Sequence, residues 1–166
     1  MAIVNSLIKK FDKDDFALIE NNSDVECIKV SKEKFLEIIV YLREDKEMYF
    51  DYLTCISGVD NQEDGTFGVV YRLYSIPFDR HLDIIVEVNK TEKNELTEAI
   101  SSISKYYRSA NWMEREVYDM YGIPFEGHPD LRRILMPSDW IGYPLRKDYS
   151  TSEKYHGITI DFESEA

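Results

Sequence analysis

Four charged residues stand close enough in the sequence to share one helix: Glu114, Arg115, Glu116 and Asp119. On a helix, Arg115 and Asp119 are four positions apart and can form an ion pair, whereas Glu116 and Asp119 line another face. Paired carboxylates can act as general acid and base, with His128 as a histidine that could assist them. Because no nucleophile or histidine adjoins them in the sequence, the spacing favours a solvated helix surface over a catalytic site.

Histidine and cysteine, the usual ligands of zinc, are few and scattered in this chain. His128 lies in the turn sequence Glu-Gly-His-Pro-Asp, where Pro129 restricts the backbone, and such a position is typical of a hydrogen-bonded turn residue. The others form no metal-binding spacing: His81, His156, Cys27 and Cys55. The sequence therefore predicts no structural zinc site and no four-cysteine iron–sulfur site, and we expect both cysteines to be reduced. It also contains neither GxGxxG nor GxxxxGK[ST], so no nucleotide site is predicted.

The stretch from Trp112 to Tyr149 concentrates prolines, glycines and aromatic residues. It holds four of the five prolines, three of the seven glycines and both tryptophans. Each proline removes a backbone donor and clashes with the preceding helical turn, so the chain cannot continue as a helix there. Since the stretch is also rich in apolar side chains, we expect an extended segment that a partner protein covers.

Two basic pairs mark this stretch, Arg132–Arg133 and Arg146–Lys147, the second followed by Asp148. Arginine suits buried ion pairs at interfaces because its guanidinium group can bind a carboxylate through two hydrogen bonds. Aromatic residues of the types that anchor interface cores lie between and beside the pairs: Trp140, Tyr143 and Tyr149. The pattern favours a protein–protein contact.

The composition limits the kinds of protein that this chain can be. With 166 residues, 43% of them hydrophobic, the chain can build one domain with a real core. Its net charge of −12 argues against nucleic acid as a partner, because phosphate contacts need clusters of lysine and arginine. No apolar run approaches the roughly 20 residues of a membrane helix, so we expect a soluble chain that meets a membrane only through partners.

The elements that would position these residues follow from hydrophobic periodicity and turn signals. Helices are expected at residues 2–11, from 31 to about 47, at 91–107 and at 112–120, the last capped by Asn111 and stopped by Gly122 and Pro124. Strands are expected at residues 15–20 and 25–30, which form a hairpin, and at 52–59, 67–76 and 81–88, which form an antiparallel meander. The predicted fold is α+β in two layers, with a body at residues 1–122 and an extended docking arm and tail at 123–166.

The charged helix and the arm together resemble the signature of a known family. Glu-Arg-Glu-x-x-Asp at 114–119 is followed by two hydrophobic residues, by His128 after six more, and by Arg-x-Ile-Leu at 132–135. Gly-His-Pro-Asp-Leu-Arg-Arg-Ile-Leu (127–135) and Gly-Tyr-Pro-Leu-Arg-Lys-Asp-Tyr (142–149) continue the match over roughly forty residues. The pattern is similar to that of the C-subunit family of respiratory complex I, the proton-pumping NADH:quinone oxidoreductase. Tyr143 departs from it, because the family more often has histidine there, and the tail lacks a longer ending rich in tyrosine and arginine.

The resemblance implies a cofactor-free subunit that is not an enzyme on its own. It would support the large quinone-site subunit and the iron–sulfur subunits of the peripheral arm, on the cytoplasmic side of the membrane, with the iron–sulfur clusters and flavin held by those partners. The residues that would carry the signature or dock partners are Glu114, Arg115, Glu116, Asp119, Gly122, His128, Pro129, Arg132, Arg133, Leu135, Trp140, Pro144, Leu145, Arg146, Lys147, Asp148 and Tyr149.

Other functions remain open from the sequence. The same subunit type recurs in membrane-bound energy-converting [NiFe] hydrogenases, in formate hydrogenlyase and in ferredoxin- or F420H2-linked oxidoreductases, where a nickel-site subunit replaces the quinone-site one. A stand-alone acid–base enzyme would require Glu114, Glu116 and His128 to converge in one pocket. A binding module without a redox partner would pack its arm only on its own domain.

Overall fold

Three long strands form the centre of the sheet: β3 (Tyr52–Asn61), β4 (Thr66–Ser75) and β5 (Arg80–Asn89). The computed structural model describes residues 2–12, 14–20, 25–90, 96 and 98–160. Neighbouring strands run antiparallel, with Tyr71 of β4 opposite Ile84 of β5. The predicted meander is confirmed, and its strands reach one to two residues further at several ends than the turn signals indicated.

A hairpin of two short strands extends the sheet. β1 (Phe16–Ile19) and β2 (Glu26–Val30) pair antiparallel as predicted, although the predicted turn at residues 21–24 lies outside the described residues. β2 pairs with β5 in parallel, so that the strand order is β1-β2-β5-β4-β3. The sheet is therefore mixed but mostly antiparallel, in agreement with the α+β prediction.

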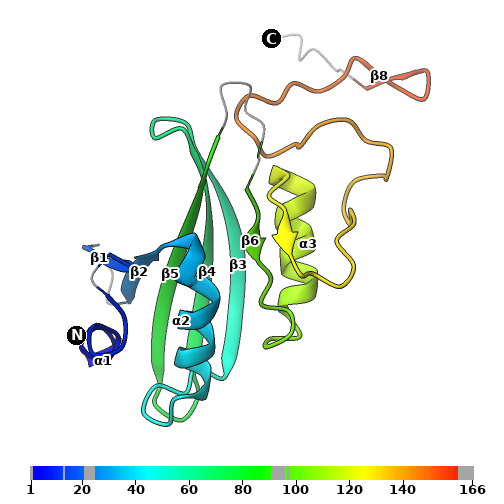
Figure 1. Cartoon of the computed structure of the whole chain (residues 1–166). Helices are drawn as coiled ribbons and strands as arrows, with labels where there is room; N and C mark the ends of the chain where they lie inside the picture. Colours follow the sequence, from blue (N-terminus) through cyan, green and yellow to red (C-terminus); the bar gives the residue numbers. More distant parts are fainter. Residues whose placement is uncertain (1, 13, 21–24, 91–95, 97, 161–166) are drawn as a thin grey trace.

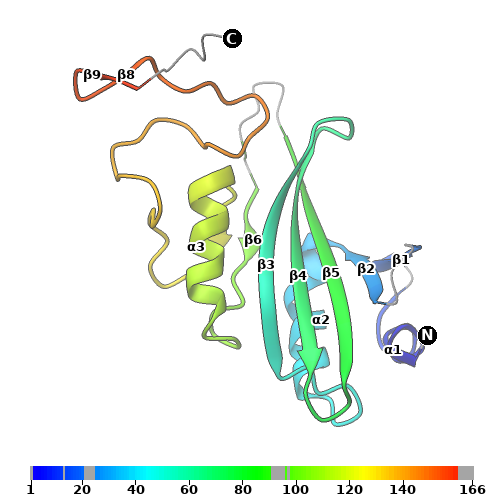
Figure 2. The ribbon, with the colours of Figure 1, turned by 180° about the vertical axis from the view of Figure 1, so that it is seen from behind.

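Helix α2 (Lys32–Glu44) covers one face of the sheet (Figure 1). It begins after Ser31, as the sequence predicts, and its inward residues are all buried: Phe35, Ile38, Ile39 and Leu42. α1 (Ala2–Ile8) is shorter than predicted but also contributes Leu7 to the core. The opposite face of the central strands is open, as the view from behind shows (Figure 2), so the molecule has the two layers that were predicted.

The helix predicted at residues 91–107 is wrong wherever the chain is described there. Residues 91–95 and 97 lie outside the described part, and from Ile100 onward the chain forms β6 (Ile100–Ser101) followed by turns. β6 pairs in parallel with β7 (Phe125–Glu126). Ile100 and Ile103 are both buried, as an apolar helix face would be. A strand followed by a turn brings two residues three positions apart into one core equally well, so their spacing did not distinguish the two structures.

Helix α3 (Ala110–Tyr121) packs against the edge strand β3 (Figure 1). It begins two residues earlier than predicted, after Ser109 instead of Asn111, and it ends at Gly122 in the left-handed conformation, as predicted. A Cβ at Gly58 of β3 would lie 2.5 Å from the Tyr121 ring, so glycine allows this close approach. The chain then returns along α3 and ends, within the described part, in the hairpin of β8 (Lys154–Tyr155) and β9 (Ile158–Thr159).

The two cysteines lie too far apart for a disulfide. Register places Cys27, Asp83, Arg72 and Cys55 side by side on four successive strands. Three strand spacings separate the cysteines by about 14 Å, well beyond the reach of a disulfide. Both are free thiols, as expected, and burial raises the pKa of Cys27.

Candidate partner-docking surface

α3 buries most of its charged residues. Glu114, Arg115 and Asp119 are buried, whereas Glu116 is exposed. The prediction of a solvated helix surface is therefore wrong, because residues 102–104 and the arm pack over this side of the helix. The predicted ion pair does not form either: within the described residues Asp119 pairs with Arg133, and the Nε of Arg115 donates to the carbonyl oxygen of Arg132 at 3.2 Å.

Asp119 is the point on α3 at which the arm is attached. Its Oδ1 accepts a hydrogen bond from Arg133 at 2.7 Å, and its Oδ2 accepts the N–H groups of Ile134, Leu135 and Met136 at 3.0, 2.7 and 2.9 Å. Burial alone would raise the pKa of Asp119, but these hydrogen bonds stabilise the carboxylate and hold the pKa below its usual range. One buried carboxylate thus orders four consecutive residues of the arm.

Arg133 connects the same site to a second part of the arm. Its Nη1 also donates to the carbonyl oxygen of Asp119 at 3.2 Å, and its Nη2 donates to the carbonyl oxygen of Gly142 at 2.8 Å. The guanidinium carbon lies 5.1 Å from the centre of the Tyr143 ring, within the range of a cation–π contact. We call residues 133–147, which Asp119 and Arg133 hold in this way, the clasped segment.

The end of the clasped segment is bound to α3 and to the sheet. The Nε of Arg146 donates to the Tyr121 carbonyl oxygen at 2.6 Å, and its guanidinium lies between the rings of Tyr143 and Phe67, 4.5 and 4.7 Å from their centres. Burial lowers the pKa of Arg146. Arg146 therefore joins the arm, the helix and strand β4.

Asp60, at the end of β3, provides a further attachment. It accepts the N–H of Lys147 at 2.8 Å and forms an ion pair with Lys90. Hydrogen bonds from Lys90 and Lys147 keep the pKa of this carboxylate lowered against the opposing effect of burial. Next to this contact, the N–H of Leu145 donates to the Met120 carbonyl oxygen at 3.1 Å. The sequence offers no signal for this role of Asp60, because its partner is 87 positions away.

Gly122 permits the close approach of the arm to the end of α3. Its φ is +73°, and a Cβ there would lie 2.5 Å from two atoms of the Tyr143 ring and 2.7 Å from Nη2 of Arg146. Gly122→Ala is therefore expected to lower the free energy of unfolding by about 1–3 kcal/mol, through backbone strain and displacement of the arm. Urea denaturation measures the change. Gly65→Ala is the control, since φ is +62° there but nothing lies within 4 Å, and an equal loss in both variants would contradict the close packing.

Glu114 and His128 meet in the interior on the other side of α3. Glu114 accepts the Ser102 hydroxyl at 2.6 Å and the Ile103 N–H at 2.8 Å, and burial outweighs these bonds and raises its pKa to about 7. His128 Nε2 lies 3.9 Å from Glu114 Oε2 and 3.0 Å from the Asn111 carbonyl oxygen. Its Nδ1 accepts the Asp130 N–H at 3.0 Å, so Nε2 carries the proton and donates to Asn111. Two of the three residues of the acid–base hypothesis thus come together, but Glu116 does not join them.

The remaining predicted site residues are either partly buried or exposed. Trp140 Nε1 donates to the Tyr149 hydroxyl at 3.0 Å, and its ring contacts that of Tyr155 at 5.2 Å, so these two predicted anchors bind each other. Pro144 is half-buried. The exposed predicted residues are Glu116, Pro129, Arg132, Leu135, Leu145, Lys147 and Asp148. Sequence reasoning missed two residues: Asp60, which accepts a hydrogen bond from Lys147 of the arm, and Ser102, whose hydroxyl donates to Glu114.

The clasped segment presents large apolar side chains to solvent. Ile141, Leu135 and Leu145 are 81%, 60% and 52% exposed. We call these three the arm apolar residues. Because the backbone that carries them is held by Asp119, Arg133 and Asp60, they stay exposed in an ordered segment, which makes them candidates for contact with a protein partner.

The described residues place no group of three or more histidine, cysteine, aspartate or glutamate side chains where they could hold a metal ion. Within the same residues, no helix is both long and apolar enough to cross a bilayer. A hollow of about 660 Å³ in the described structure lies beside α2, and neither Glu114 nor His128 lines it.

The fold is also found in a solved membrane complex. A chain in the structure of the membrane-bound sulfane sulfur reductase, an archaeal respiratory membrane complex, superimposes with a TM-score of 0.68 over 90% of this chain and 84% of that one. The two sequences are 21% identical, so this likeness concerns the fold alone.

Sequence relatives are more specific. The C subunit of NADH-quinone oxidoreductase from Trichlorobacter lovleyi is 40% identical over 148 residues, covering 88% of this chain and 86% of the relative. The C subunit from Chloroherpeton thalassium is 48% identical over 126 residues, which are 75% of this chain and 50% of that protein. The C/D subunit from Yersinia pestis is 36% identical over 155 residues, and the match covers 89% of this chain and 25% of the Yersinia protein. The family described as the 30 kDa subunit of respiratory-chain NADH dehydrogenase matches residues 28–155. The chain therefore belongs to the family of the 30 kDa subunit, or C subunit, of respiratory complex I.

Proposed function

We propose that this chain is a cofactor-free structural subunit of a complex I-type NADH:quinone oxidoreductase. It would join the quinone-site subunit to the iron–sulfur subunits in the peripheral arm, on the cytoplasmic side of the membrane. The observation that carries the proposal is the ordered exposure of the arm apolar residues, Ile141 above all. The ion pair of the buried Asp119 with Arg133 holds them in place before any partner binds, which lowers the entropy cost of association.

The relatives support a place in complex I over a place in a hydrogenase. Sequences 36–48% identical to this chain carry the name NADH-quinone oxidoreductase, whereas the likeness to the sulfane sulfur reductase complex is one of fold. An equivalent place in a membrane-bound [NiFe] hydrogenase, a formate hydrogenlyase or a ferredoxin- or F420H2-linked enzyme is the alternative. Purification of the tagged chain from its own cells, followed by mass spectrometry, separates the two. Co-purified quinone-site, iron–sulfur and flavin subunits support complex I, and a nickel-site subunit among them would contradict it.

Ile141→Asp tests the docking role directly. The side chain is 81% exposed, so the isolated variant should melt as the wild type does. Loss of a central apolar contact costs about 2 kcal/mol or more at an interface, which weakens association roughly thirty-fold or more. The measurement is the yield of iron–sulfur subunits that co-purify with the tagged variant when it replaces the native chain.

Ile76→Asp is the matched control for this experiment. Ile76 is 59% exposed in the turn between β4 and β5, far along the chain from the arm. The same change of side chain there should leave assembly intact. If Ile141→Asp assembled as fully as Ile76→Asp, the clasped segment would have no docking role.

A further inference from the structure

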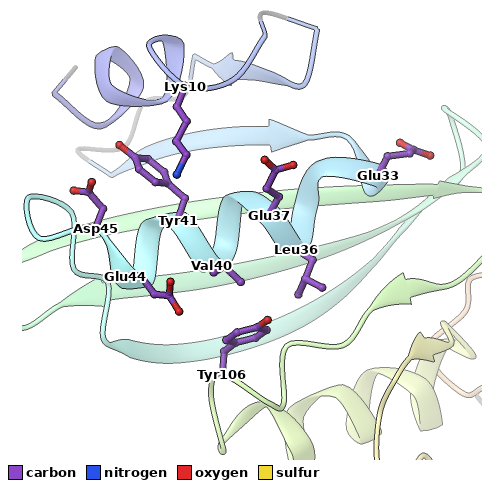
Figure 3. A pocket seen from close by; sticks show the side chains of 9 residues that line it. All are labelled: Lys10, Glu33, Leu36, Glu37, Val40, Tyr41, Glu44, Asp45 and Tyr106. Carbon is purple, nitrogen blue, oxygen red and sulfur yellow. The ribbon is translucent and has the colours of Figure 1, made fainter.

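A groove of about 660 Å³ lies beside α2, outside the surface described above. Its walls come from three parts of the chain: α2 itself, Lys10 in the segment after α1, and Tyr106 in the turn before α3. In the view of Figure 3, Lys10 and Tyr106 lie on opposite sides of α2. None of the residues that line it belongs to α3 or to the clasped segment.

The floor of the groove is a second apolar stripe of α2. The first stripe, which includes Phe35 and Ile38, is fully buried against the sheet. Leu36 and Val40 are four positions apart, only partly buried, and line the groove on the same side of α2 as Tyr106, whereas Tyr41 points to the opposite side, toward Lys10 (Figure 3). A helix that covers one sheet needs a single apolar stripe. Leu36 also packs partly against the core, and the surface that Leu36 and Val40 leave exposed in the groove is available for another contact.

Carboxylates lie beside this apolar stripe. The described lining includes four acidic residues, Glu33, Glu37, Glu44 and Asp45. The cation in the same lining, Lys10, lies over the Tyr41 ring at 4.1 Å from its centre. Lys34, outside the lining, forms an ion pair with Glu37 at 2.9 Å. The balance of charge in the groove stays negative, so it would repel an acidic occupant and attract a basic one.

We infer that this groove binds a basic amphipathic helix of a partner protein. Apolar residues of that helix would contact Leu36 and Val40, and its lysine or arginine side chains would face Glu37 and Glu44. The stripe from Glu33 to Glu44 is about 16 Å long, enough for three turns of a helix packed along α2. The described lining contains no strand edge that could take up an extended peptide, which favours a helical occupant. This inference is independent of the role proposed for the arm.

A synthetic helical peptide of about 18 residues, with leucine on one face and lysine on the other, serves as the probe. Titration calorimetry measures its affinity for the full chain, and the methyl NMR signals of Leu36 and Val40 report where it binds. Glu37→Lys with Glu44→Lys reverses the charge of the groove and should weaken binding about ten-fold or more. Glu63→Lys with Asp64→Lys makes the same change of net charge in the turn between β3 and β4 and should leave the affinity within about three-fold.

Each other outcome overturns the inference. Equal weakening by the two double variants would mean that the peptide responds only to the net charge of the chain. Equal binding of a peptide with glutamate in place of lysine would exclude a role for the carboxylates, and equal binding of a scrambled peptide would exclude a helix. Unmoved methyl signals of Leu36 and Val40 would place the peptide elsewhere. Self-association of the wild-type chain that Glu37→Lys with Glu44→Lys abolishes would make a second copy the occupant.

Discussion

Asp119→Ala is expected to lower the free energy of unfolding by about 3–5 kcal/mol, because it leaves the guanidinium of Arg133, whose side chain is only 15% exposed, without its carboxylate. It also leaves the N–H groups of residues 134–136 without the acceptor they share. The clasped segment should detach from α3 before the sheet unfolds. Urea denaturation measures the loss, and hydrogen exchange should show faster exchange at residues 134–136 than in β4.

Two variants separate this effect from a general weakening of α3. Asp119→Asn keeps the shape and one acceptor but loses the charge, so it should fall between the wild type and the alanine variant. Glu116→Ala, on the exposed side of the same helix, should change stability by less than about 0.5 kcal/mol. If hydrogen exchange at residues 134–136 stayed slow in Asp119→Ala, the carboxylate would not be what holds the arm.

The same geometry indicates how two further substitutions in the arm would act. Arginine and tryptophan often anchor interfaces, so Arg133→Ala and Trp140→Ala would remove partner contacts if these side chains met a partner directly. Arg133 instead binds Asp119 and Gly142, and Trp140 binds Tyr149. We therefore expect both to act by disordering the segment that carries Ile141, so that stability and assembly fall together.

Glu114 is expected to make stability depend on pH near neutrality. Its pKa is about 7 in the folded chain, against 4.5 for the ordinary group, because it is fully buried beside Tyr71 and His128. The folded state thus keeps a proton that the unfolded state releases between pH 4.5 and about 7. The contribution of Glu114 to the free energy of unfolding is complete below pH 4.5, decreases as the pH rises, and is lost above about pH 7. The free energy of unfolding changes by about 3 kcal/mol over this range.

Glu114→Gln isolates this contribution. The amide cannot ionise, so the variant should lose the fall in unfolding free energy between pH 5 and 7 and should exceed the wild type in stability at pH 8. Urea denaturation at several pH values measures both. Glu116→Gln removes an exposed carboxylate from the same helix and should follow the wild-type curve. Asp60 and Asp119 have lowered pKa values and titrate below this window. A variant curve parallel to the wild-type curve would show that Glu114 is ionised in the folded chain throughout.

Local signals in the sequence predicted most of the elements. Alternation of apolar and polar residues located β3, β4 and β5, and the helical spacing of Phe35, Ile38 and Leu42 located α2. Gly122 was identified as the end of α3 because glycine readily adopts the left-handed conformation found there. These features depend on residues a few positions apart, which is why one sequence is enough to find them.

Contacts between distant residues were not accessible in this way. The parallel pairing of β2 with β5 depends on how α2 and the meander pack, and no turn sequence specifies it. The segment around Ile100 looked like a helix because two buried isoleucines three positions apart fit a helix and a strand with a turn alike. Its true partner, Phe125, is 25 residues further along the chain.

The sequence by itself determined the family, through some forty matching residues, and determined which residues of α3 and the arm belong to its signature. Only the tertiary structure decided what those residues do. Asp119 could have paired with Arg115 on its own helix, but burial by the arm excludes water and selects Arg133, whose charge would otherwise be costly to bury. The same burial raises the pKa of Glu114 and leaves Ile141 outside. Burial is set by the packing of distant segments, and it is burial that converts a charge pattern into structural attachments, a titrating group and an exposed surface.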